Sequence, residues 1–150
     1  MKKGMAAALF VLAGLFTVVI VQPAMAQEKT HYLAIHVDDN DKGKMNIALN
    51  NAANVTKYYA AKGEKVEIEI VAYGPGLHMY RADTSPVKTR IAAMSLEHEN
   101  LKFSACGNTL NGMTKKEGKM PELISEATVV PSGVVRLMEL QEEGWTYLRP

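Results

Sequence analysis

The order of apolar and polar positions in the first part of residues 27–150 predicts a strand followed by a helix. Residues 31–37 form a nearly continuous apolar run that ends at Asp38, which is typical of a strand covered on both faces. From Met45 to Tyr59 the apolar positions recur at helical spacing, and Gly63 ends the pattern. We therefore predict a buried first strand and a helix of about four turns.

Residues 66–73 follow a different pattern, because their early part alternates strictly between apolar and acidic side chains. This alternation predicts a strand with one solvated face, which we expect at a sheet edge or against a partner molecule. A turn at Gly74–Gly76 follows the strand. Ser85 and Pro86 then mark the start of a second helix that runs to about Glu97.

The rest of the chain continues to alternate between strand and helix. We predict a strand at 101–105, a short helical segment from Gly107 that Gly112 and Gly118 interrupt, a strand at 127–130, a helix that Ser132 caps and Gly144 ends, and a strand at 145–148. This order predicts one three-layer α/β domain with a mainly parallel, five-stranded sheet. Right-handed crossovers place the carboxyl ends of parallel strands on one edge, where ligands and reactive groups gather.

Several residues with chemical or conformational potential lie near the end of a predicted strand or follow one, and so belong to that edge. They are His36, Gly74, Gly76, His78, Cys106, Gly107 and Asn108. His36 is either a hydrogen-bonded core histidine or a base that serves Cys106. His78 either lines the site or lies in the loop beside it. Asn108 either orients a group bound to Cys106 or caps the following helix.

Residues 1–26 have the parts of a secretory signal peptide. Lys2 and Lys3 supply a positive start, an apolar stretch follows, and Ala24-Met25-Ala26 is a small-residue cleavage site. We expect cleavage to leave Gln27 as the first residue of a periplasmic domain, residues 27–150. The apolar stretch is longer than usual for a signal peptide, so an uncleaved membrane anchor is the alternative.

The charge balance of the mature domain excludes one class of partner. Lys2 and Lys3 are the only charged side chains of residues 1–26, so the mature domain keeps 15 of the 17 basic side chains against all 16 acidic ones. A net charge near minus one gives no electrostatic basis for binding nucleic acid. We therefore expect no nucleic-acid partner.

The sequence also argues against a metal or an organic cofactor. The four histidines are widely spaced and there is no second cysteine, which is unlike a metal-ligand motif. The Gly74-Pro75-Gly76 turn lacks the glycine spacing of a dinucleotide fingerprint and the lysine and serine of a phosphate-binding loop. We therefore expect neither a metal nor a cofactor.

Cys106 is the only cysteine of the 150 residues and the strongest candidate for chemistry. It follows a predicted strand and precedes a helix start, where backbone N–H groups stabilise a thiolate. A single cysteine cannot form an internal disulfide, so an exported domain carries it as a free thiol. Such a thiol is either buried and inert or retained for use. We expect Cys106 at a partly exposed position.

Four short strings resemble the DsrE/DsrF-like sulfur-relay family. They are NNAAN at 50–54, YGPGLH at 73–78, FSACGNT at 103–109 and VPSGVV at 130–135. The resemblance extends over residues 30–150 and is closest to small exported members. It implies a flavodoxin-like sheet, a homo-oligomer that is a trimer or hexamer, and a cysteine, here Cys106, that carries sulfur as a persulfide. Export makes periplasmic handling of reduced sulfur the better inference than a cytoplasmic relay.

Three functions remain open at this point. In the first, Cys106 takes sulfane sulfur from small sulfur species and passes it to a thiol-bearing acceptor protein. In the second, the protein is a non-catalytic oligomeric binding module and Cys106 is structural. In the third, the protein is a cysteine-dependent hydrolase or peroxidase, for which the sequence offers no evident base and orienting acid. Reactivity of the thiol in the folded protein separates the first function from the second.

Overall fold

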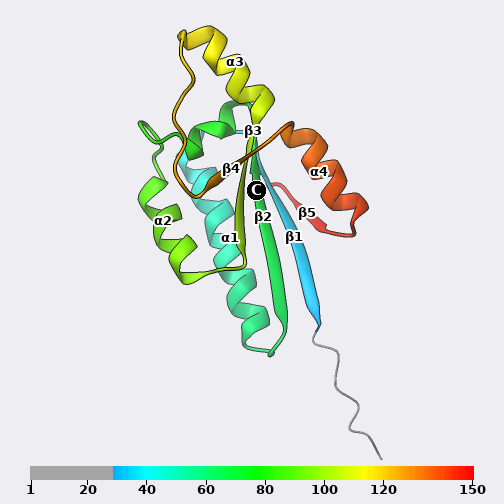
Figure 1. Cartoon of the computed structure of the whole chain (residues 1–150). Coiled ribbons are helices and arrows are strands. Elements are labelled where there is room, and N and C mark those ends of the chain that lie inside the picture. The colour runs from blue at the N-terminus through cyan, green and yellow to red at the C-terminus, as the bar shows by residue number, and fades with distance from the viewer. Residues whose placement is uncertain (1–28) are drawn as a thin grey trace, which may run out of the picture.

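Five parallel strands form the centre of the computed structural model, which describes residues 29–150 (Figure 1). The strands are β1 (Thr30–Val37), β2 (Lys65–Ala72), β3 (Leu101–Cys106), β4 (Ala127–Val130) and β5 (Thr146–Leu148). They pair in the order β4-β3-β2-β1-β5, and each of these pairings is parallel. The predicted α/β class with a parallel five-stranded sheet is therefore confirmed.

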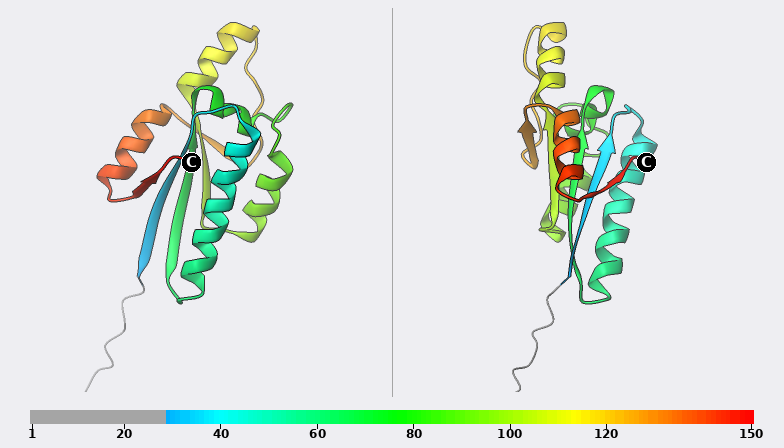
Figure 2. Two further views of the ribbon diagram at one scale, coloured as in Figure 1. Left: turned by 180° about the vertical axis from the view of Figure 1, so that it is seen from behind. Right: turned by 90° about the vertical axis from the view of Figure 1, so that its right-hand side faces the viewer.

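Helices flank the sheet on both faces. They are α1 (Lys42–Ala60), the short 3₁₀ helix η1 (Gly74–Tyr80), α2 (Lys88–Glu97), α3 (Gly107–Glu117) and α4 (Gly133–Glu142). Apolar side chains of α1 and α2 pack on one face of the sheet, and those of α4 pack on the other. Figure 2 shows α3 projecting beyond the edge at which the strands end. This arrangement is a three-layer, flavodoxin-like fold.

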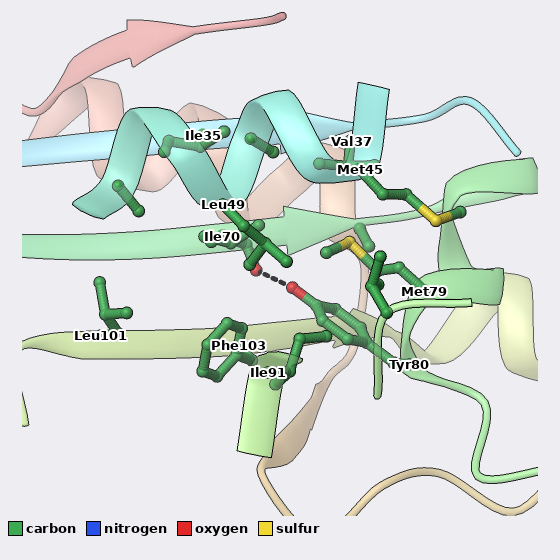
Figure 3. Close-up of a cluster of buried hydrophobic side chains, with 14 of the residues drawn as sticks. Ile35, Val37, Met45, Leu49, Ile70, Met79, Tyr80, Ile91, Leu101 and Phe103 are labelled. Carbon is green, nitrogen blue, oxygen red and sulfur yellow. Dashed lines mark hydrogen bonds between the residues drawn. The ribbon is translucent and has the colours of Figure 1, made fainter. Parts of the chain in front are cut away.

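The main core lies between the sheet and helices α1 and α2 (Figure 3). Alternate positions of the strands, such as Ile35, Ile70 and Phe103, point to this layer and are almost fully buried. The hydroxyl of the buried Tyr80 donates a hydrogen bond to the carbonyl oxygen of Ile70 at 2.7 Å. The phenol thus adds its large apolar ring to the core without leaving its polar atom unpaired.

The strand with the alternating pattern, β2, lies in the middle of the sheet, so the expected edge position is wrong. Its acidic positions face the α4 layer, which covers only part of that side. A cleft of about 540 Å³ remains between α4 and the strands β3 and β4, and Glu69 and Arg136 line it. Glu69 is nevertheless buried and pairs with Arg136 of α4, so the polar face of β2 reflects an ion pair beneath this helix rather than a sheet edge.

Three local predictions differ from the structure. Helix α2 begins at Lys88, two residues later than expected, because the Ser85 hydroxyl accepts the N–H of Val87 at 3.3 Å before the helical turn starts. Helix α3 passes through Gly112 without interruption, since one glycine costs a helix only about 1 kcal/mol. The stretch after β2 is a 3₁₀ helix rather than a simple turn.

The predicted signal peptide, residues 1–26, lies outside the described residues. Within residues 29–150, none of the helices combines the length and the apolar character that crossing a bilayer requires.

Candidate thiol site

Cys106 is the last residue of β3 and also the residue that precedes the first turn of α3. Its backbone is extended, with φ −69° and ψ 115°, so the chain passes directly from strand to helix at the sulfur-bearing residue. Alternation along β3 directs Cys106 and Ser104 to the α4 layer. The residue is only 4 % exposed. The expected partly exposed position is therefore wrong, because the start of α4 covers the side chain.

The amino end of α4 lies against Cys106 because its first residue is glycine. A Cβ atom on Gly133 would lie 3.1 Å from the Cβ of Cys106 and 3.0 Å from the Cβ of Tyr73. A side chain at Gly133 would thus force these groups apart. The sequence brings this helix to the site because β4 pairs with β3, with Val130 opposite Cys106, and α4 begins just after β4.

Two helix amino ends therefore meet at one sulfur atom. Helix α3 begins at Gly107, directly after Cys106, and α4 begins at Gly133. Neither helix has an acidic side chain in its first turn, so no carboxylate there offsets the positive ends of the helix dipoles. This arrangement favours a negative charge at the sulfur.

The pKa of the Cys106 thiol reflects two opposing effects. Burial raises the pKa, whereas hydrogen bonding from the Thr109 hydroxyl and from the backbone N–H groups of Gly133 and Thr109 lowers it. The hydrogen bonds outweigh burial, and the pKa lies below its ordinary value. The site can therefore hold a thiolate more readily than an unstructured cysteine does.

His36 lies in the same layer but serves a different group. Its ring stacks on Tyr73 with 4.5 Å between the ring centroids, and Nδ1 forms a 2.7 Å hydrogen bond with the hydroxyl of Tyr147. Nε2 is buried without a hydrogen-bond partner among the described residues and lies 3.7 Å from the carboxylate of Asp38. The ring nitrogens thus face Tyr147 and Asp38, which does not place His36 as a base beside Cys106. Burial lowers the pKa of His36.

The other candidate residues near the carboxyl ends of the strands hold loops in place. Nδ1 of His78 lies 2.5 Å from the side-chain oxygen of Asn40. A Cβ on Gly76 would come within 2.2 Å of the carbonyl oxygen of Val37, so only glycine fits. The N–H of Gly74 donates to the Thr109 hydroxyl oxygen at 2.9 Å. Gly74 therefore belongs to the surroundings of the thiol.

The two residues after the cysteine contribute through their backbones. A Cβ on Gly107 would lie 3.1 Å from the carbonyl oxygen of Val130. This close approach of two segments of the chain explains the glycine at this position. The N–H of Asn108 donates to the carbonyl oxygen of Pro131 at 3.2 Å, and the Asn108 side chain is exposed. The structure thus shows no cap formed by the Asn108 side chain.

Sequence reasoning assigned no role to Thr109, Tyr73 or Gly133. All three lie in the strings that carry the family resemblance, but a threonine in a first helical turn or a glycine after a serine has many structural explanations. Only the positions of β2, β3 and α4 in space bring these residues to the sulfur. Within residues 29–150, no group of three or more His, Cys, Asp or Glu side chains could hold a metal ion.

The chain matches the model of the DsrE/DsrF-like family over residues 31–150. It belongs to the DsrE/DsrF-like family. Four chains of known structure match this DsrE/DsrF-like chain, among them a protein of unknown function, MTH1491, from Methanobacterium thermoautotrophicum. That protein is 30 % identical, with a TM-score of 0.67, and the similarity covers 80 % of this chain and 99 % of the other. No curated protein matches significantly.

Proteins of the DsrE/DsrF-like family are often oligomeric components of sulfur relays. Family membership therefore supports a sulfur-relay type of role in general.

Proposed function

We propose that this DsrE/DsrF-like protein binds and transfers sulfane sulfur in the periplasm, carrying it as a persulfide on Cys106. The observation that carries the proposal is the lowered pKa of a single thiol at the meeting point of two helix amino ends. A thiolate is the form of cysteine that attacks sulfur. A persulfide anion carries its charge on the outer sulfur, about 2 Å beyond the Cys106 sulfur, where the positive ends of the same two helix dipoles still favour a negative charge.

The loading step is a sulfur–sulfur exchange that needs no external oxidant. The Cys106 thiolate attacks a terminal sulfur of a polysulfide dianion, a new S–S bond forms to Cys106, and the adjacent S–S bond of the polysulfide breaks. The products are the Cys106 persulfide anion and a polysulfide dianion shorter by one sulfur atom. The electron pair of the broken bond leaves with the shortened polysulfide.

Transfer to an acceptor follows the same chemistry. An acceptor thiolate attacks the outer sulfur of the protonated Cys106 persulfide, the S–S bond to Cys106 breaks, and the Cys106 thiolate leaves. The acceptor then carries the persulfide and its proton. Because the S–S bond is about 2 Å long, the transferred sulfur lies farther out than the Cys106 sulfur and is easier for a partner thiol to reach.

The low exposure of Cys106 supports small sulfur species as donors and a thiol-bearing protein as acceptor. A residue that is 4 % exposed admits a small unbranched anion more easily than a bulky substrate. The signal peptide predicted for residues 1–26 supports a periplasmic location, with the mature domain starting at Gln27. Family membership supports a homo-oligomer, for which we propose a trimer or hexamer.

A structural role for Cys106 is the second candidate, because burial is also what a non-catalytic binding module requires of a small apolar residue. The lowered pKa speaks against that role. A cysteine-dependent hydrolase has less support, because both ring nitrogens of His36 face other groups.

The deciding experiment is intact-mass spectrometry of the folded protein after incubation with polysulfide. We expect a gain of one or more sulfur atoms that is lost on reduction, and no gain in Cys106→Ser. Circular dichroism of Cys106→Ser serves as the control for folding. Wild type that stays unmodified, or a Cys106→Ser variant that does not fold, would assign Cys106 to the structural role.

A further inference from the structure

We propose that Thr109 and Gly133 are positioning residues of the thiol site: Thr109 directs its hydroxyl proton at the Cys106 sulfur, and Gly133 lets the first turn of α4 approach it. The inference deepens the proposed function and rests on it, because it assigns the control of the reacting thiolate to two residues that do not themselves react. Three observations carry it, namely one hydrogen bond, one close approach and the surrounding charge.

The first observation concerns the hydroxyl of Thr109, which has one proton and an oxygen that can accept. The N–H of Gly74 donates to that oxygen at 2.9 Å. Gly74 has φ +52°, in the left-handed region that favours glycine, so its backbone N–H has a fixed direction. Thr109 lies in the first turn of α3, three residues after Cys106, and accepts from Gly74, so its hydroxyl proton is available for the Cys106 sulfur. Hydrogen bonding from this hydroxyl is among the causes that lower the pKa of the thiol.

A second threonine in the same helix shows the usual alternative. The hydroxyl of Thr114 donates to the carbonyl oxygen of Leu110, four residues earlier, at 2.8 Å. Thr109 differs because Gly74 approaches it from the end of β2 and Cys106 lies three residues before it. The contact with Gly74 therefore links the loop after β2 to the thiol, and Thr114 supplies a matched control in the same helix.

The second observation concerns the approach of α4. A Cβ on Gly133 would meet both the Cβ of Cys106 and the side chain of Tyr73 at 3.0 to 3.1 Å. Relief of these contacts would move the start of α4 away from the sulfur and weaken the hydrogen bond from its N–H. In contrast, a Cβ on Gly112 of α3 would meet no heavy atom within 4 Å.

The third observation is the charge around the sulfur. The first turns of α3 and α4 contain no acidic residue, and the charged Arg136 of α4 is bound to Glu69. The titratable side chain that interacts with Cys106 is Tyr73, and burial raises the pKa of its phenol, so it stays neutral where the thiol ionises. Among the hydrogen bonds that lower the pKa of the thiol, those from the Thr109 hydroxyl and the Gly133 N–H have the largest effects.

The test measures the pH dependence of thiolate formation in the purified protein. Thiolate is followed by its ultraviolet absorbance, with Cys106→Ser as the blank, and by the rate of alkylation with iodoacetamide. We expect Thr109→Val to raise the midpoint pH of thiolate formation. The same substitution should slow alkylation at neutral pH by roughly two- to tenfold. Thr109→Ser retains the hydroxyl and should restore the wild-type profile, and Thr114→Val should not change it.

Gly133→Ala should also raise the midpoint pH of thiolate formation, whereas Gly112→Ala should leave it unchanged. Identical profiles for Thr109→Val and Thr114→Val would overturn the role of Thr109, and identical profiles for Gly133→Ala and Gly112→Ala would overturn that of Gly133. If Gly133→Ala does not fold, the threonine series decides the inference. Polysulfide labelling of wild type is read separately: its failure would refute persulfide transfer while leaving the midpoints interpretable.

Discussion

At the scale of the residue, burial and hydrogen bonding act on Cys106 in opposite directions. Burial alone would raise the thiol pKa and leave an inert side chain. The surrounding N–H and O–H donors reverse that outcome, so a residue that is 4 % exposed keeps a lowered pKa. From these two effects we expect burial to restrict which reagents reach the sulfur, and the donors to favour its reaction with those that do.

Reagent size should therefore decide the reactivity of Cys106 in the folded protein. We expect methyl methanethiosulfonate, which is small, to react faster near neutral pH than it does with a free cysteine peptide. A bulky aromatic disulfide should react slowly until urea unfolds the chain. Stopped-flow measurement of both rates checks the expectation. If unfolding accelerated the reactions of both reagents by the same factor, burial of Cys106 would not select between small and bulky reagents.

Stability should fall in mildly acidic solution because of His36. Burial lowers the pKa of this 5 % exposed histidine in the folded state, whereas in the unfolded chain its pKa has the ordinary value of about 6.5. The unfolded state then binds the proton first, so stability is complete above about pH 6.5 and is lost as the pH falls below it.

Urea unfolding between about pH 5 and 8 measures this loss. His36→Gln keeps a polar group for Tyr147 but cannot titrate, so its stability should vary less with pH across the same interval. His78→Gln is the matched control, since His78 lies at the loop beside Asn40. A His36→Gln variant with the same pH dependence as wild type would contradict the assignment.

At the scale of the element, α4 is held to the sheet by a small apolar cluster and one ion pair. Leu137 and Leu140 pack on Ala34 and Val71 of the central strands. Arg136 donates two hydrogen bonds to the carboxylate of Glu69 on β2, at 2.9 and 2.8 Å. The ion pair therefore fixes the helix whose first residue touches the thiol.

Loss of the Arg136 guanidinium should destabilise the fold because it leaves a buried charge without its charged partner. Glu69 is 2 % exposed, so Arg136→Met leaves its carboxylate with the Ser104 hydroxyl as the remaining donor, at 2.7 Å. We expect a cost of about 3–5 kcal/mol in the free energy of unfolding, measured with urea. Arg90→Met is the control: Arg90 bonds neutral oxygens of Asn46, and its loss should cost about 1 kcal/mol. Equal costs would contradict this account.

At the scale of the whole molecule, the strand order explains where the site lies. The chain adds β2, β3 and β4 outward from β1, and the connection through α4 then returns to place β5 on the other side of β1. This return crosses the face opposite α1, so α4 starts beside the carboxyl end of β3. The reversal in strand order thus produces the second helix amino end at Cys106.

The assembly of the chain in solution gives a prediction at this scale. We expect the mature domain to be a homo-oligomer, a trimer or a multiple of it, as proposed from family membership. Light scattering coupled to size-exclusion chromatography measures the mass in solution. A monomer at micromolar concentration would contradict the prediction.

Processing of the chain gives a prediction for its location. We expect the exported protein to begin at Gln27 and to appear in the periplasmic fraction, because Ala24-Met25-Ala26 has the form of a cleavage site. Intact-mass analysis of that fraction checks the new amino terminus. Full-length chain in the membrane fraction would support an anchor instead.

Local sequence patterns were enough to predict the class of the fold and the place of Cys106 between a strand and a helix. The apolar runs and the helical spacing of residues 31–59 predicted β1 and α1, because each pattern depends on near neighbours in the chain. The position of Cys106 between a strand and a helix was equally local. Membership of the DsrE/DsrF-like family agrees with the resemblance of the four strings.

Only the tertiary structure decided the surroundings of the Cys106 sulfur. Thr109, Gly133 and the end of β2 come together through strand order and helix packing, which no window of neighbouring residues encodes. The central position of β2 depended on the same long-range pairing, so its polar face suggested an edge that is not there. Sequence alone determined that one thiol lies at a strand end. The crossing of α4 over the sheet determined that the thiol is buried, enclosed and surrounded by hydrogen-bond donors, because these properties arise from segments far apart in the chain.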